Sequence, residues 1–308
     1  METKTHSVAV RRSPLRPWPE TLQLVSELYE FFGAQGVRKL AATRIRAYRD
    51  AFETFKQAAD SGARLPRAEA EDVIETMVEF EQLRIIMDAA KKSLRPSAWV
   101  SQLKKLAAGP TFATAETAAA SPRDTQFECF LGAVAARGGY DITFDEPDIV
   151  LHDGTFRFVV AAKRPRSVSS VEKNCRKAAR QIAASGLPGV IALDLTHALH
   201  AGWCLTPETR EDALSIAEES VETFLAAHEP LLKRYVNRRA AAVLVSVHLP
   251  AIIGIPTQPQ LMTAVAWRFM NISNDLVEIT WLAAFAKRCI NGLFGPVTPD
   301  EPPFAETA

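Results

Sequence analysis

The sequence has no excess of charge of either sign, few cysteines and no long apolar run. Its 36 lysines and arginines balance 36 aspartates and glutamates. The total charge therefore gives no argument for a nucleic-acid partner, although a local basic patch is compatible with it. The four cysteines lie far apart and form no CxxC pair, which argues against a disulfide framework or a structural zinc site and favours a cytoplasmic location. No apolar run reaches the roughly 18 residues of a transmembrane helix, so no membrane partner is expected.

Several nucleotide-binding and hydrolase motifs are also missing. The chain contains no GxxxxGK[ST], no GxGxxG and no GxSxG element. Their absence argues against nucleotide hydrolysis, dinucleotide binding and the α/β-hydrolase mechanism.

The length of 308 residues and a change of pattern near residue 110 predict two domains. Apolar residues at three- to five-residue spacing predict helices over 20–33, 37–55, 69–86 and 98–107. The predicted organisation is a flexible N-terminus over 1–19, an all-helical domain over 20–108, a linker over 109–122, an α/β domain over 123–294 and a flexible tail over 295–308.

The pattern of the second domain predicts a three-layer α/β core with a mixed sheet. Asp153-Gly154 is a strong turn signal between two alternating segments, which predicts a β-hairpin. The expected helices cover 125–137, 168–184, 208–238 and 275–290, and the expected strands cover 140–144, 149–151, 155–162, 189–195, 241–247 and 264–269.

Two charged residues mark the open end of the predicted hairpin. Asp148 precedes its first arm and Lys163 ends its second, so strand pairing is expected to bring them together at one edge of the sheet. Carboxylates grouped at a strand end suit a hard divalent cation. A lysine beside them can position a hydroxide or stabilise charge growing on phosphorus. Taken singly, each residue is equally compatible with an ordinary strand end.

In these elements the sequence resembles the PD-(D/E)xK nuclease superfamily, which has the restriction-endonuclease-like fold. The resemblance covers about 124–200, and its matching residues are Glu128, Pro147-Asp148, Ala161-Ala162-Lys163 and Gln181. It implies a DNA endonuclease dependent on Mg²⁺ or Mn²⁺, with a possible place in antiphage defence. It also implies a metal held by Asp148, Glu128 and the Ala162 carbonyl, with Lys163 orienting the attacking water and Gln181 helping to place the phosphate.

One position departs from the family pattern. The family has an acid two residues before the lysine, where this chain has Ala161. Either Ala161 is a substitution that disables an enzyme, or the chain is a natural degenerate member that binds nucleic acid or scaffolds a complex without cutting. In both cases the chain as written is expected to be inactive or severely weakened.

A basic segment follows the motif. Residues 163–180 hold seven basic residues against one acid, and four of the seven recur at helical spacing on one face. Such a face suits a phosphate backbone, although a solvated helix face is the simpler alternative. Beyond Lys163, the expected DNA contacts are Arg164, Arg166, Lys173, Arg176, Lys177 and Arg180.

Three further expectations concern residues outside this motif. His197, His200 and Cys204 have a spacing compatible with zinc but show no fourth ligand. Asp194, at the end of a predicted strand, is a candidate accessory carboxylate. The helical domain is a candidate site for a protein partner or for dimerisation.

Overall fold

The computed structural model describes residues 16–37, 43–93, 96–108, 122–200, 204–236, 239–253, 260–271 and 276–294. The expected flexible N-terminus, linker and tail therefore lie outside the described residues, except for residues 16–19 and 122. None of the helices in the described part of the chain is long and apolar enough to cross a membrane.

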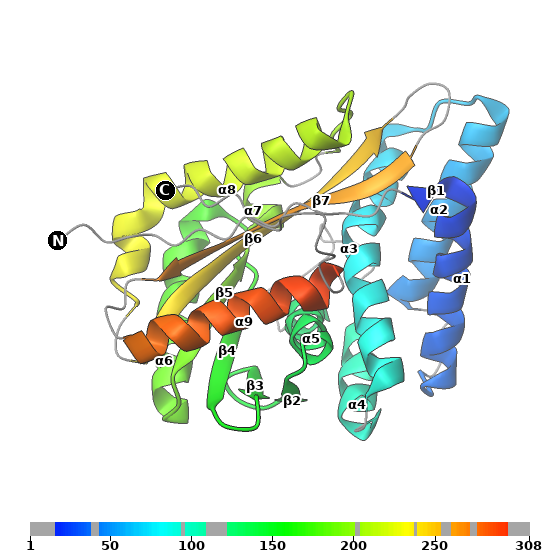
Figure 1. The fold of residues 1–308 in the computed structure, drawn as a ribbon. Coiled ribbons are helices and arrows are strands. Elements are labelled where there is room, and N and C mark those ends of the chain that lie inside the picture. Colours follow the sequence, from blue (N-terminus) through cyan, green and yellow to red (C-terminus); the bar gives the residue numbers. More distant parts are fainter. Residues whose placement is uncertain are drawn as a thin grey trace, which may run out of the picture.

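The N-terminal part is helical, as expected from its periodicity. Its helices are α1 (Trp18–Ala34), α2 (Arg44–Ser61), α3 (Arg67–Lys92) and α4 (Pro96–Ala107) (Figure 1). One short strand precedes them: β1 (Arg16–Pro17) pairs with the strand β7 described below, which differs from the flexible lead-in expected there. The second half of α3 is buried nearly all round, because other elements pack on several of its sides.

The next part contains the predicted hairpin and the helices on either side of it. It comprises α5 (Pro122–Arg137), β2 (Asp141–Thr143), β3 (Ile149–His152), β4 (Arg157–Lys163), α6 (Val171–Ser185) and β5 (Gly189–Asp194). The hairpin turns at Asp153-Gly154, where Gly154 has a φ of 96° that favours glycine. The predicted order of helices and strands is confirmed here.

The chain continues with α7 (Thr196–His200), α8 (Arg210–Lys233), β6 (Ala240–Ile253), β7 (Gln260–Asn271) and α9 (Leu276–Phe294). Both β6 and β7 are longer than expected. Pro250 is accommodated in β6 because it lies beyond Ser246, the last residue of β6 that pairs with β5.

The strands form one mixed sheet in the order β1-β7-β6-β5-β4-β3-β2. Strands β4, β5 and β6 are mutually parallel, and the other pairs are antiparallel. The expected mixed α/β architecture is therefore confirmed.

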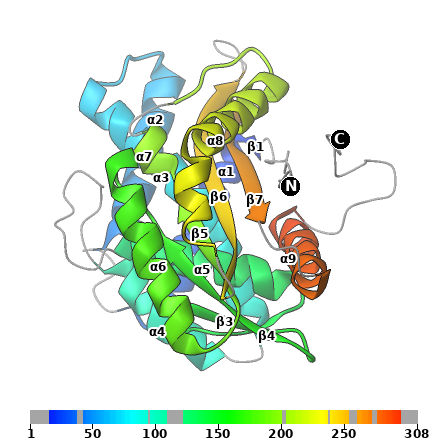
Figure 2. The same cartoon turned by 90° about the vertical axis from the view of Figure 1, so that its left-hand side faces the viewer.

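Apolar clusters cover both faces of this sheet. One cluster joins the sheet to α6 and α8, which lie toward the viewer in Figure 2. The other joins it to α5 and α9, and also contains side chains of α1 to α4. The N-terminal helices thus share a continuous core with the α/β part. Alternate residues of β4 enter different clusters, and this alternation determines the surroundings of the candidate site.

Candidate functional site

The hairpin brings Asp148 and Lys163 together at the carboxyl end of β4. Ile149 pairs with Val160, which places Asp148 beside the last residues of β4. Its Oδ2 accepts hydrogen bonds from the Lys163 Nζ at 2.6 Å and from the Ala162 backbone amide at 2.7 Å. The Lys163 Nζ also lies 2.8 Å from the Ala162 carbonyl oxygen. The expected juxtaposition is therefore present, and it takes the form of a largely buried ion pair.

Glu128 approaches this pair from α5. Burial raises the pKa of its carboxyl to about 7, and the negative charge of Asp148 adds to the effect. Burial also raises the pKa of Asp148, although Lys163 and the Ala162 amide oppose that shift. The charge of Asp148 thus disfavours a second ionised carboxylate beside the Asp148–Lys163 pair.

Ala161 lies on a different side of β4 from its neighbour Ala162. Its side chain is fully buried in the apolar cluster of α6 and α8, whereas Ala162 belongs to the cluster of α5 and α9. In β4, Ala161 pairs with Ile191 of β5. The position where the family pattern has an acid is therefore part of a packed apolar layer.

The donor set does not fit the metal that the resemblance implies. Within the residues that the structure describes, no group of three or more His, Cys, Asp or Glu side chains is placed to hold a metal ion. Of the predicted ligands, the Asp148 carboxylate and the Ala162 carbonyl do converge, but they converge on the ammonium of Lys163. Mg²⁺ requires near-octahedral oxygen ligation, usually with one or two carboxylates.

Gln181 lies near this region but has a different partner from the one expected. Its Nε2 donates to Glu146 Oε2 at 3.0 Å, and Glu146 is two residues before Asp148. The hydrogen bond thus joins α6 to the segment that leads into β3. The Oε1 of Gln181 is buried without a hydrogen-bond partner.

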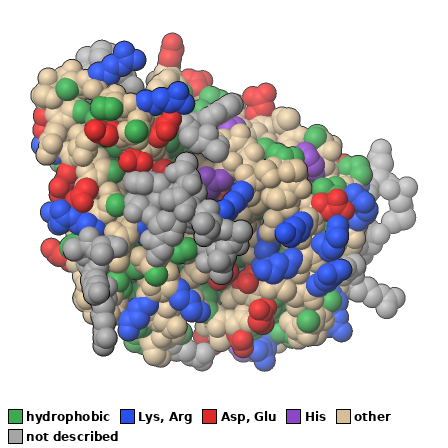
Figure 3. Space-filling model, turned by 180° about the vertical axis from the view of Figure 1, so that it is seen from behind, with side chains coloured by type: hydrophobic (Ala, Val, Ile, Leu, Met, Phe, Trp, Pro, Cys, Tyr) green, Lys and Arg blue, Asp and Glu red, His purple; other side chains and the backbone are tan. Residues whose placement is uncertain are grey.

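The basic face of α6 is exposed as the spacing predicted. Its apolar side, which includes Cys175 and Ala178, packs into the core. Ser167 and Ser170 form a capping box at a 3₁₀ turn, Val168–Ser170, directly before the helix. Figure 3 shows lysine and arginine side chains gathered on the side of the molecule that α6 covers. The exposed cations of this segment are Arg166, Lys173, Arg176, Lys177 and Arg180.

Arg164 does not belong to that exposed set. Its side chain is buried, 3.0 Å from Glu79 of α3 and 3.0 Å from Asp194 at the end of β5. Arg123 lies 3.3 Å from the same Glu79 oxygen. Although burial opposes it, Arg164 holds the pKa of Glu79 well below its usual value, aided by His197, Arg123 and Arg44. The expected phosphate contact is thus replaced by an internal ion network.

Sequence reasoning missed the α3 side of this network. Thr76, Glu79 and Gln82 are all buried and recur every three residues on α3. That spacing of polar residues within an apolar helix was the signal for a buried polar stripe. Asp194, expected as an accessory carboxylate, also accepts from the Thr196 hydroxyl at 2.5 Å.

The residues suggested for zinc have separate partners. His197 Nε2 lies 3.9 Å from Glu79, and His200 Nε2 lies 2.9 Å from the Ser220 hydroxyl. The Cys204 thiol contacts the Leu205 carbonyl at 3.7 Å. These side chains therefore do not assemble a zinc site among the described residues.

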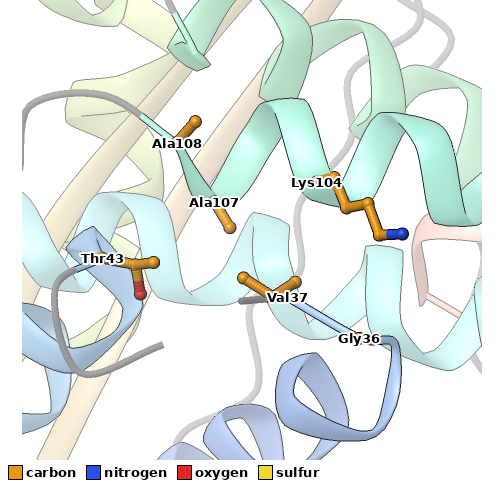
Figure 4. A pocket seen from close by; sticks show the side chains of 6 residues that line it. All are labelled: Gly36, Val37, Thr43, Lys104, Ala107 and Ala108. Carbon is orange, nitrogen blue, oxygen red and sulfur yellow. The ribbon is translucent and has the colours of Figure 1, made fainter. Parts of the chain in front are cut away.

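A hollow of about 340 Å³ lies among the N-terminal helices, away from the elements that carry the motif (Figure 4). Among the described residues that line it, Lys104 is the one charged residue, and the others are Gly36, Val37, Thr43, Ala107 and Ala108. None of the predicted site residues lines it.

Comparison of the chain with protein-family models, with curated proteins and with solved structures finds no match in any of the three. A function must therefore be argued from the side chains at the end of β4 and on α6.

Proposed function

We propose that residues 123–294 form a PD-(D/E)xK nuclease-like core that binds DNA along α6 and, with alanine at position 161, does not cleave it. The order α5–β2–β3–β4–α6–β5 supports such a core, with β2 to β4 antiparallel and β5 parallel to β4. The positions of Asp148 and Lys163 at adjoining strand ends support it further.

The exposed face of α6 is the observation that carries DNA binding. Lys173, Arg176, Lys177 and Arg180 stand at i, i+3, i+4 and i+7, so they project from one side of a helix whose other side is buried. A row of cations neutralises successive phosphates and releases counterions, which supplies affinity without sequence specificity. Because these residues are already exposed, binding requires no rearrangement of the core.

The surroundings of Lys163 support the absence of cleavage. The predicted third acid is replaced by the buried methyl group of Ala161. The remaining oxygens of Asp148 and Ala162 already hold an ammonium group. Because the Lys163 ammonium is engaged in this ion pair, it is poorly placed to orient a nucleophilic water.

Charge neutralisation on α6 tests the binding proposal. Changing Lys173, Arg176, Lys177 and Arg180 together to Gln should weaken binding of a duplex by at least about tenfold near 0.1 M salt, because each of these cations is expected to pair with about one phosphate. It should also reduce the slope of log K against log salt by up to about 3.6, at about 0.9 for each phosphate neutralised.

The matched control removes four positive charges from the N-terminal helices. Lys56, Lys91, Lys92 and Lys104 are all exposed, and their change to Gln lowers the net charge equally. Equal losses of affinity in both quadruple variants would show that α6 is not the interface. Tighter binding of a single-stranded or duplex RNA of the same sequence would assign the face to RNA.

A further inference from the structure

The Lys163 ammonium occupies an unusual place for a lysine at a strand end. It does not extend into solvent; its side chain is 9% exposed and that of Asp148 is 13% exposed. The ammonium lies within 2.8 Å of two oxygens, the Asp148 Oδ2 and the carbonyl of Ala162, the residue directly before it in the chain. These are short charge-assisted contacts.

A carboxylate and a backbone carbonyl converging on one point are ligands that hard divalent cations use. We propose that the Lys163 ammonium is a built-in cation that fills the position between Asp148 and the Ala162 carbonyl, excludes Mg²⁺ and Mn²⁺ from it, and leaves a weak divalent-cation site when it is removed. This inference goes beyond DNA binding and does not depend on it.

Charge balance favours the ammonium over a divalent ion here. Asp148 and Lys163 neutralise each other, so a divalent ion entering beside Lys163 would bring two more positive charges to the pair. The side chain at position 161 supplies no further carboxylate, because Ala161 lies in the apolar cluster of α6 and α8. Such an ion must therefore displace the ammonium or remain outside.

Displacement is opposed by the covalent connection of the ammonium. Lys163 directly follows Ala162, so the cation and one of its oxygens are held on the same short stretch of chain. A tethered group of this kind competes at an effective concentration on the order of millimolar or above. Free Mg²⁺ with only two protein oxygens has little advantage over it.

The test is a titration of the full chain with Mn²⁺, in which electron paramagnetic resonance measures the concentration of free Mn²⁺ at each step. The wild-type protein should show no saturable binding that depends on Asp148, as judged against Asp148→Asn. Lys163→Met should bind one Mn²⁺ with an affinity at least tenfold above the upper limit set by wild type, and adding Asp148→Asn should abolish the gain. Lys92→Met, which removes an equal charge from an exposed position of α3, should behave as wild type.

Two results would overturn the proposal. One is stoichiometric Mn²⁺ binding by the wild-type chain that Asp148→Asn removes, a comparison that needs no Lys163 variant to fold. The other is that neither Lys163→Met nor Lys163→Gln gains affinity for Mn²⁺, although thermal unfolding shows at least one of them to be folded. Lys163→Gln is included because it keeps an amide donor toward Asp148. DNA binding by α6 is measured separately, so its failure would not be confused with either result.

Discussion

Replacing Ala161 with glutamate distinguishes two possibilities. Either the site is a metal site that lacks only one carboxylate, or position 161 belongs to an apolar layer that has no room for a carboxylate. Ala161 is fully buried on the interior strand β4, pairs with Ile191 of β5 and belongs to the apolar layer under α6 and α8. A glutamate introduced there must either enter that layer or turn toward Lys163, which lies two residues on and on the same side of the strand.

The expected cost follows from these surroundings. Forcing extra side-chain atoms into a packed layer costs about 1–3 kcal/mol. Burying a carboxylate costs several kcal/mol more, which attraction to Lys163 offsets in part. We therefore expect the free energy of unfolding to fall by about 3–5 kcal/mol, because the offset does not cancel the burial cost. At about 2–4 °C per kcal/mol, the melting temperature should drop by about 6–20 °C.

Thermal unfolding followed by circular dichroism measures this drop. The control is Ala183→Glu, which adds the same side chain at an exposed position of α6 and should change stability by no more than about 0.5 kcal/mol. Nicking of supercoiled plasmid with Mn²⁺ is measured on the same preparations. If Ala161→Glu melts within about 2 °C of wild type and cuts DNA in a manner that requires Asp148, the packing argument and the non-cleaving proposal are both refuted.

Further outcomes follow from three largely buried groups, Glu79, Glu128 and Cys175. Glu79→Gln should lower the free energy of unfolding by about 3–5 kcal/mol in urea, because Arg164 loses a buried partner; an unchanged midpoint would contradict this. Because the pKa of Glu79 is lowered below 4.5, wild type should also lose its advantage over that variant as pH falls through and below 4.5. The melting temperature of Glu128→Gln should rise relative to that of wild type as the pH increases from 5 to 8, because a carboxyl with a raised pKa of about 7 destabilises the fold once it is ionised. A difference in melting temperature that stays constant over this range would contradict the prediction. Burial raises the pKa of the Cys175 thiol to about 12, so its reaction with a disulfide reagent should be slow until urea unfolds the chain, and rapid native labelling would contradict the packing of α6.

The fold was predictable where sequence signals are local. The Asp153-Gly154 turn and the alternation on either side of it specify the hairpin, and the amphipathic spacing of α6 specifies which face is buried. The extents of β6 and β7 were not predictable in the same way. Nearly all of their residues are buried, so the alternation between inward and outward residues that marks a half-buried strand is absent.

The same distinction applies to the site. Asp148 and Lys163 belong to one hairpin, so their proximity follows from strand pairing. The burial of the Arg164 side chain depends on its ion pair with Glu79, which lies 85 residues earlier in the chain. No local pattern shows that Glu79 of α3 would lie beside the residue that follows β4. The run of basic residues therefore predicted a single DNA interface. In the structure the cations of α6 form an exposed face, whereas Arg164 belongs to a buried ion network.

Lys163 is the last residue of β4 and Arg164 follows it directly, yet different partners neutralise these two adjacent cations. Lys163 is paired with Asp148, while Arg164 is paired with Glu79 and Asp194. A metal ion or a phosphate reaching the end of β4 would have to break one of these buried pairs and leave a charge without its partner, which is costly. The face of α6 imposes no such requirement, so DNA should associate with it rapidly and with strong salt dependence, whereas any chemistry at the end of β4 must first open an internal ion pair.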